Sequence, residues 1–196
     1  ILLDELAQKP TTTARLRAAT RIALEAGLLE ETLELASTAL QGLEGQARRG
    51  FLTVLARETE EVRRGDKVAL WAYESIREQA SDLTEIKALN YRIVTAALGM
   101  GDTLKALEAQ YAIADALPRE NSERRRALAD GLRMGVIRNT EEQIAALEHF
   151  KSEFPQAREI DELSVLIALG LDPLDDEVLA KNLLDGVDGP RSDIER

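Results

Sequence analysis

The residues best suited to chemistry in this sequence are arginines in the stretch ERRRALADGLR, which runs from Glu123 to Arg133. Arg126 and Arg133 are seven residues apart, so they share one face of a helix. A guanidinium can hold a carboxylate through two parallel hydrogen bonds, which suits an acidic peptide or a free C-terminus. The alternative is a solvated face on which these arginines pair with the many nearby Glu and Asp side chains. We predict Arg126 and Arg133 as partner-binding residues.

Two other groups of residues lack the partner residues that a catalytic or metal site would need. The stretch LDPLDDEVL brings Asp172, Asp175, Asp176 and Glu177 together, as in a divalent-cation or diphosphate site of a helical enzyme. Such a site needs a second acidic cluster opposite the first, and a helix cap followed by an acidic first turn explains the stretch better. His149 is the only histidine, and neither Glu nor His stands three or four residues before it to build a helical metal pair. The sequence also lacks P-loop, GxSxG, GxGxxG and HExxH motifs, so we predict no catalytic, cofactor or metal site.

Composition and charge narrow the function classes further. Hydrophobic residues make up 44% and charged residues 31% of the 196 residues, so the chain can bury a core. Aromatic residues are only 4%, and Ala, Leu, Glu and Arg dominate, which favours an all-α protein. The net charge is −11, and residues 99–196 hold 21 acidic against 12 basic side chains. Because phosphate polymers and anionic bilayers repel such a surface, we predict no nucleic-acid partner and no membrane insertion.

Helical stretches alternate with short turns along the chain. Turn signals fall at residues 27, 65, 101 and about 139, at intervals of 38, 36 and 38. At 65/66 and 101/102 the signal is a Gly-Asp pair, in which glycine accepts a positive φ at the end of one helix and aspartate caps the next. Helices joined by such short turns lie antiparallel, and these intervals are typical of helical-hairpin repeats. We predict a single helical-repeat domain with units at approximately 11–44, 45–80, 82–118, 121–155 and 157–186.

Capping and periodicity predict individual helix ends and faces. A helix that starts near Gln46 is expected to run to Gly65, and Asp82 with Glu85 is expected to form a capping box for a later helix. Asp172 is expected to cap the last helix. The helix after the second Gly-Asp pair is expected to bury one stripe of its surface, namely Leu104, Leu107, Tyr111 and Ala114.

This arrangement resembles the tetratricopeptide repeat family. The best unit runs from Ile86 to Pro118, with Gly101 at the family's turn glycine and Ala106 at the small position of its second helix. The segment EEQIAALEHFKSEFPQA also resembles the second helix of repeats in bacterial envelope-assembly proteins. The sequence departs from the family seven residues before each turn, and other helical-repeat families share the hairpin pattern. In place of a small residue, these positions hold Thr20, Glu58, Val94 and Leu132.

The resemblance implies both a fold and a function. The fold is all-α, an α-solenoid of stacked antiparallel helix hairpins (a TPR-like superhelix), and its function is that of a non-enzymatic scaffold or adaptor which binds a protein or peptide on a curved helical surface. First helices line the groove in that family, so Tyr91 and Thr95 are expected to face the partner. One alternative is a structural spacer or oligomerisation module of an envelope assembly, with self-association through an exposed repeat end. A helical enzyme with an acidic metal site is a less favoured one.

The cellular setting is predicted from the same resemblance. Similarity to bacterial envelope proteins favours the periplasm, with the cytoplasm as the alternative. The chain has no cysteine from which to infer a redox compartment. Its first residue is Ile1 rather than Met, so we expect a fragment of a longer protein.

Overall fold

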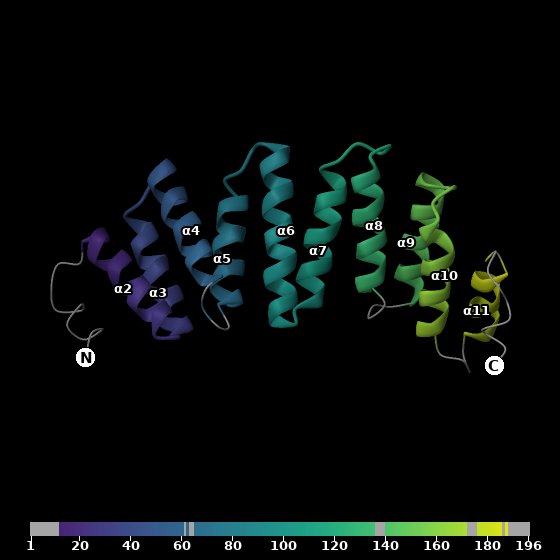
Figure 1. Ribbon diagram of the computed structural model, residues 1–196, viewed down its shortest axis with the longest axis horizontal. Helices are drawn as coiled ribbons and strands as arrows, with labels where there is room; N and C mark the ends of the chain where they lie inside the picture. Colours follow the sequence, from purple (N-terminus) through teal and green to yellow (C-terminus); the bar gives the residue numbers. More distant parts are fainter. Residues whose placement is uncertain are drawn as a thin grey trace. The chain divides into compact units, whose positions relative to one another are not determined.

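The computed structural model describes residues 12–60, 62, 65–135, 140–171, 176–185 and 187. Over these residues the chain forms helices and no strand (Figure 1). Its internal contacts divide it into two compact units, residues 1–109 and 110–196, which are described one at a time. The boundaries of the five predicted repeat units stay a prediction, and the predicted turn near residue 139 lies outside the described residues.

The first unit consists of antiparallel helices in which each hairpin packs on the next. Helix α2 pairs with α3 and α4 pairs with α5, while α2 also contacts α4 and α3 contacts α5 (Figure 1). Helix α5 continues the stack onto α6. Because each of these hairpins packs against the next, it depends on that neighbour to cover its apolar face. The helices are α2 (Thr13–Glu25), α3 (Leu29–Gln41), α4 (Gly45–Thr59), α5 (Asp66–Arg77), α6 (Leu83–Met100) and the start of α7 (Thr103–Asp115).

Leucine and alanine at helical spacing build the core of this unit. Leu52, Val68 and Ile93 are fully buried, and each such side chain contributes roughly 1.5–3 kcal/mol by leaving water. Fully buried alanines such as Ala36 and Ala72 let neighbouring helix backbones approach closely. The buried leucines and alanines are therefore the surfaces on which these helices meet.

The two Gly-Asp pairs differ in structure. At the second pair the prediction is confirmed, because Gly101 has a φ of 75° and Asp102 Oδ1 accepts a hydrogen bond from Lys105 N at 3.0 Å. At the first pair it is wrong, because Gly65 has a φ of −68° and Asp66 is the first residue of α5.

The cause lies in the end of the preceding helix. Helix α4 ends at Thr59, where the hydroxyl donates to the backbone carbonyl of Ala56 at 2.5 Å, and not at Gly65 as predicted. Gly65 then folds back onto Thr59, so close to its carbonyl oxygen that a Cβ would clash. At this position glycine is needed for close approach, whereas Gly101 is needed for its backbone conformation.

Other local predictions have mixed outcomes. Asp82 Oδ2 accepts a hydrogen bond from Glu85 N at 2.9 Å, which confirms that cap. Leu104 was expected in the buried stripe of α7, but its side chain is 59% exposed, and Ala106 and Ala109 are buried instead. Helix α7 is apolar over much of its surface, so periodicity alone did not determine which side packs.

The second unit contains the end of α7 and four further helices. Helix α8 contacts both α9 and α10, α9 contacts α10, and α10 contacts α11. Its core includes Leu147, Phe150, Leu163 and Ile167, all buried. The helices are α8 (Ser122–Met134), α9 (Thr140–Glu153), α10 (Glu159–Gly170) and α11 (Glu177–Leu184).

The last helix starts later than the sequence predicts. Asp176 holds the N-cap position of α11, whereas Asp172 was expected to cap it. Asp172, Pro173 and Asp175 lie outside the described residues.

Candidate functional site

A groove in the first unit lies between α4, α5 and α6 and has a volume of about 380 Å³. The buried side chains of Ile76 and Leu89 contribute an apolar lining. Arg49 and Arg57 line it from α4, and Arg92 lines it from α6. An apolar lining with guanidinium groups around it suits a peptide that combines an apolar residue with carboxylates.

Carboxylates inside the groove partly neutralise its arginines. Glu60 Oε1 accepts hydrogen bonds from the Tyr73 hydroxyl and from Arg92 Nη1, both at 2.8 Å. Burial of the phenol, and after it the hydrogen bond and charge of Glu60, raise the pKa of Tyr73 to about 12, so the hydroxyl stays protonated at neutral pH. Arg49 forms an ion pair with Glu85.

Arg57 differs from the other arginines of this groove. Its side chain is exposed in the last turn of α4, and within the described part of the chain it has no ion pair or hydrogen bond. A guanidinium without an internal partner can bind a carboxylate of another molecule without first breaking a bond. Arg57 is therefore the arginine of this groove that is best placed to bind a partner.

The arginines of α8 in the second unit are mostly used inside the protein. Arg124 binds Glu153 through Nε to Oε1 at 2.6 Å and Nη2 to Oε2 at 3.2 Å, and its Nη1 donates to the carbonyl of Ala114 at 2.6 Å. Both charged side chains of this pair are about nine-tenths buried. The hydrogen bond between them raises the pKa of Arg124 and lowers that of Glu153. This buried pair joins α8 to α9, and the bond to Ala114 joins α8 to α7.

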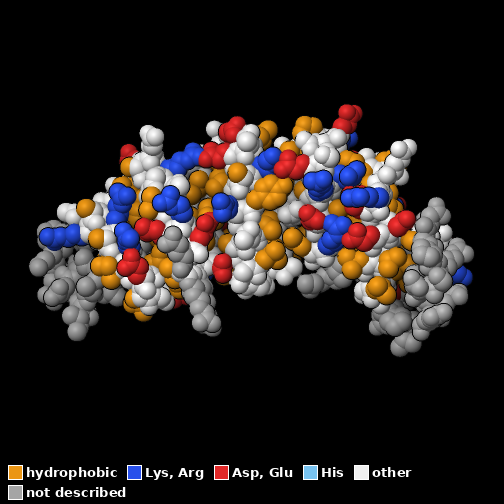
Figure 2. Space-filling view, viewed as in Figure 1, with side chains coloured by type: hydrophobic (Ala, Val, Ile, Leu, Met, Phe, Trp, Pro, Cys, Tyr) orange, Lys and Arg blue, Asp and Glu red, His pale blue; other side chains and the backbone are white. Residues whose placement is uncertain are grey.

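Arg133 is used in the same way at the other end of α8. It binds Glu162 of α10 through Nε to Oε1 at 2.9 Å and Nη2 to Oε2 at 3.0 Å, and Asp130 Oδ1 at 2.7 Å. These hydrogen bonds, first that of Glu162, raise the pKa of Arg133, and Arg133 lowers the pKa of Glu162. Figure 2 shows the resulting pattern of interleaved basic and acidic side chains over α8.

The four predicted binding residues differ in the interactions that their side chains already make within the protein. Arg126 is exposed and, within the described ranges, has no ion pair or hydrogen bond, whereas Arg133 already holds carboxylates. Tyr91 and Thr95 are exposed on α6, and the Thr95 hydroxyl donates to the backbone carbonyl of Tyr91 at 3.1 Å. Tyr91 and Thr95 belong to the first unit and the two arginines to the second, so the structure does not bring the two pairs together. Their binding role stays a prediction.

Charge is distributed unequally between the two helices of each hairpin. The first helices α2, α4, α6 and α8 carry net charges of +2, +2, +1 and +2, although the whole chain carries −11. Their partners α3, α5, α7 and α9 carry −3, 0, −1 and −3. Helix α10 departs from the pattern with −3, and two of its acidic residues face arginines of α8.

Sequence reasoning missed Tyr73, Arg57 and Arg92 of the groove. The excess of arginine on the first helices was the signal that could have identified the two arginines. Tyr73 carried no such signal, because its contact with Glu60 depends on how α4 ends.

The described residues contain no group of three or more His, Asp or Glu side chains that could hold a metal ion. Asp172 and Asp175 of the acidic stretch lie outside them. In the same part of the chain, every helix is too short or too polar to cross a membrane.

Comparison with known proteins identifies the fold. No protein-family model matches this sequence, and no curated protein matches it. Among solved structures, the chain is similar to the nearly identical TPR-like repeats of a Podosopora anserina protein described as a kinesin light chain. The similarity has a TM-score of 0.50 at 15% sequence identity and covers 91% of this chain and 94% of that chain. The chain therefore has a TPR-like helical-repeat fold, which confirms the predicted α-solenoid of antiparallel hairpins.

Proposed function

We propose that this protein is a non-enzymatic interaction module that binds an acidic segment of a partner protein along the first helices of its hairpins. TPR-like repeats generally mediate contacts between proteins, because stacked hairpins present an extended surface. Their first helices are basic here, although the protein as a whole is acidic. Charge of that kind on one set of helices favours a partner of opposite charge.

The observation that carries this proposal is the groove between α4, α5 and α6. Its apolar lining can take a leucine-sized side chain, and its arginines can bind neighbouring carboxylates. Arg57 contributes most, because it has no bond to give up within the described residues. Arg92 and Arg49 contribute less, because each already faces a carboxylate of the groove.

The residues predicted from sequence belong to both units, Tyr91 and Thr95 to the first and Arg126 and Arg133 to the second. Arg126 is exposed and binds a carboxylate in the same way as Arg57. Arg133 takes part only if an incoming carboxylate displaces Glu162, so its contribution is smaller. Tyr91 and Thr95 are exposed on α6, the helix that also contributes Leu89 and Arg92 to the groove.

A peptide pair tests the charge preference. One labelled peptide alternates leucines with glutamates, and the other carries lysines in place of the glutamates. Fluorescence anisotropy at low and high salt should show that Arg57→Glu weakens binding of the acidic peptide about tenfold, since one attraction becomes a repulsion.

Lys181→Glu is the matched control for this variant. It changes the net charge of the protein by the same amount as Arg57→Glu, but at an exposed position on α11. If both variants weaken binding equally, the peptide senses only the overall charge and the groove is not its site. If the acidic peptide does not bind at all, the proposal is wrong.

A structural spacer or oligomerisation module remains the second candidate from the sequence, because repeat hairpins end in faces that other hairpins can cover. Sedimentation across a range of concentrations separates the two candidates. The average molecular mass of a self-associating module rises with concentration, whereas that of a monomeric binder stays constant. The bacterial origin and the periplasmic location are proposals that depend on the sequence resemblance alone.

A further inference from the structure

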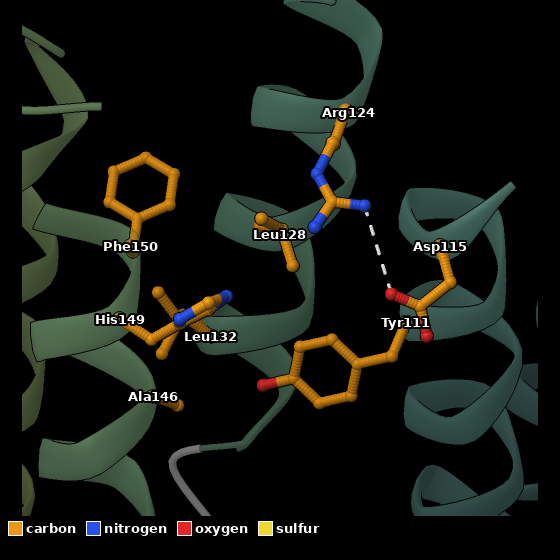
Figure 3. A pocket seen from close by; sticks show the side chains of 8 residues that line it. All are labelled: Tyr111, Asp115, Arg124, Leu128, Leu132, Ala146, His149 and Phe150. Carbon is orange, nitrogen blue, oxygen red and sulfur yellow. Dashed lines mark ion pairs between the residues drawn. The ribbon is translucent and has the colours of Figure 1, made fainter. Parts of the chain in front are cut away.

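A second hollow lies in the second unit, where the end of α7 and the helices α8 and α9 meet (Figure 3). We call it the α7–α9 notch. The Tyr111 ring enters it from α7, His149 faces it from α9, and Leu128 and Leu132 of α8 lie behind them (Figure 3). The full set of lining residues is Tyr111, Asp115, Arg124, Leu128, Leu132, Ala146, His149 and Phe150.

The notch lies on the side of α8 away from the predicted binding arginines. Leu128 and Leu132 face it, whereas Arg126 and Arg133 are rotated from Leu128 by about 150° at 3.6 residues per turn. Gly131 makes room for the Tyr111 ring, because a Cβ at this position would lie 2.9 Å from a ring carbon. The notch is therefore a separate surface from the one that the proposed function uses.

Its size and lining suit one side chain of a protein partner. The volume is about 190 Å³, below the roughly 300–1,000 Å³ that small-molecule sites occupy. The floor is apolar, since Leu128, Leu132 and Phe150 line it. An anchor residue that fills such a pocket contributes much of the energy of a protein interface.

The charges near the notch specify the rest of the partner. Arg124 is neutralised by Glu153, so Asp115, which lies 3.7 Å from Arg124 and is 79% exposed, keeps most of its negative potential. Glu142 is exposed and lies one turn before Ala146 on the same face of α9. One exposed carboxylate thus stands near the C-terminal end of α7, and the other stands at the start of α9.

We propose that the α7–α9 notch binds a partner segment in which a bulky apolar residue is flanked by Lys or Arg. The apolar residue enters between Tyr111 and His149, and the flanking cations pair with Asp115 and Glu142. This partner is opposite in charge to the one proposed for the first helices, so one chain can join an acidic and a basic partner.

A labelled peptide with leucine between lysines is the probe, at moderate salt to limit non-specific attraction to the acidic protein. Glu142→Lys should weaken its binding about three- to tenfold, and Glu148→Lys should change it less than twofold. Glu148 is the matched control because it is also exposed on α9 but lies roughly 120° from Glu142, and roughly 160° from Ala146 of the notch, around the helix at 3.6 residues per turn. Equal effects of the two variants would overturn the proposal, because they would show attraction to the whole surface.

Two further measurements test the apolar anchor. A peptide with serine in place of leucine should lose at least about tenfold in affinity, since the pocket then stays unfilled. Ala146→Trp should block the notch, with circular dichroism to verify that the variant folds. Unchanged binding of either the serine peptide or a folded Ala146→Trp variant would contradict the proposal.

Arg57→Glu separates this inference from the proposed function. It should leave binding of the lysine peptide unchanged or slightly stronger, because Arg57 lies in the other unit. A loss of lysine-peptide binding in Arg57→Glu would show that both peptides share the first groove, which would overturn the α7–α9 notch as a separate site.

Discussion

Arginines on first helices form ion pairs of very different burial in the two compact units. In the second unit, Arg124 is about nine-tenths buried with Glu153 and holds it through two hydrogen bonds. In the first unit, Arg92 and Glu60 form a pair whose side chains are 60% and 45% exposed. A buried pair cannot open without leaving a charge away from water, whereas an exposed pair can exchange its partner at little cost.

The difference shows that the position of a buried acidic partner, and not the arginine itself, decides whether an arginine joins two helices or stays exposed. Glu153 and Glu159 are buried beside α8 and fix two arginines there. No such carboxylate lies against Arg57 in the described part of the first unit. The same residue type in the same kind of helix therefore either joins hairpins or remains available for a partner.

The largest expected effect is on the buried pair. Arg124→Met should lower the free energy of unfolding by about 3 kcal/mol, because Glu153 would keep its charge in a buried site without a counter-ion. Urea unfolding followed by circular dichroism measures this change. Replacing both partners, as Arg124→Met with Glu153→Leu, should recover most of the loss. A loss below about 1 kcal/mol in the single variant would show that the pair is not buried in solution.

The next largest effect is expected from acid, which should remove the contribution of the Arg124–Glu153 pair to stability. The pKa of Glu153 is lowered from its ordinary value of 4.5, first by the hydrogen bond from Arg124, so its contribution to stability is complete above that pH. The contribution is lost as the pH falls from about 4.5 through the lowered value in the folded protein. The free energy of unfolding should therefore fall less steeply with decreasing pH in the double variant (Arg124→Met with Glu153→Leu) than in the unchanged protein. Parallel curves would contradict the assignment.

Partly exposed pairs should contribute less. Arg133→Ala should cost about 0.5–1 kcal/mol, because Arg133 is 36% and Glu162 is 59% exposed, although the geometry is bidentate. Arg92→Ala should cost less than about 0.5 kcal/mol, because its pair is more exposed. Urea unfolding of the two variants shows which one loses more stability. A larger loss in Arg92→Ala than in Arg133→Ala would contradict the difference between the two units.

The smallest effect on stability is expected at Arg57. Arg57→Glu should change the free energy of unfolding by less than about 0.5 kcal/mol, since the side chain is exposed and has no partner among the described residues. The same variant should weaken binding of the acidic peptide. A clear loss of stability in thermal unfolding would mean that Arg57 has a structural role.

Much of the fold was predictable because it depends on local signals. Asp82 and Asp102 cap helices as predicted, since a cap needs only a side chain and the backbone a few residues away. The prediction failed at Gly65, where the end of α4 depends on how Thr59 packs. It failed again at Leu104, because a helix rich in Leu and Ala has more than one apolar side.

The candidate site was predictable only in its chemistry. The sequence indicated arginine and a carboxylate partner, and it also offered pairing with nearby acidic residues as the alternative interpretation of Arg126 and Arg133. The structure places Arg133 in such pairs and leaves Arg126 exposed. Arg57 was missed, because the excess of arginine on first helices marks it no more than the other arginines of those helices.

The sequence alone determined the helical hairpins, the caps at Asp82 and Asp102 and the excess of arginine on first helices, because each depends on residues close together in the chain. Only the tertiary structure decided which arginines have an acidic partner within the protein. Arg124 meets Glu153 across 29 residues and Arg133 meets Glu162 across 29 residues, through contacts that form when hairpins pack. Side-chain pairing at that separation depends on burial and on the faces of two helices, and spacing in a single sequence does not contain that information.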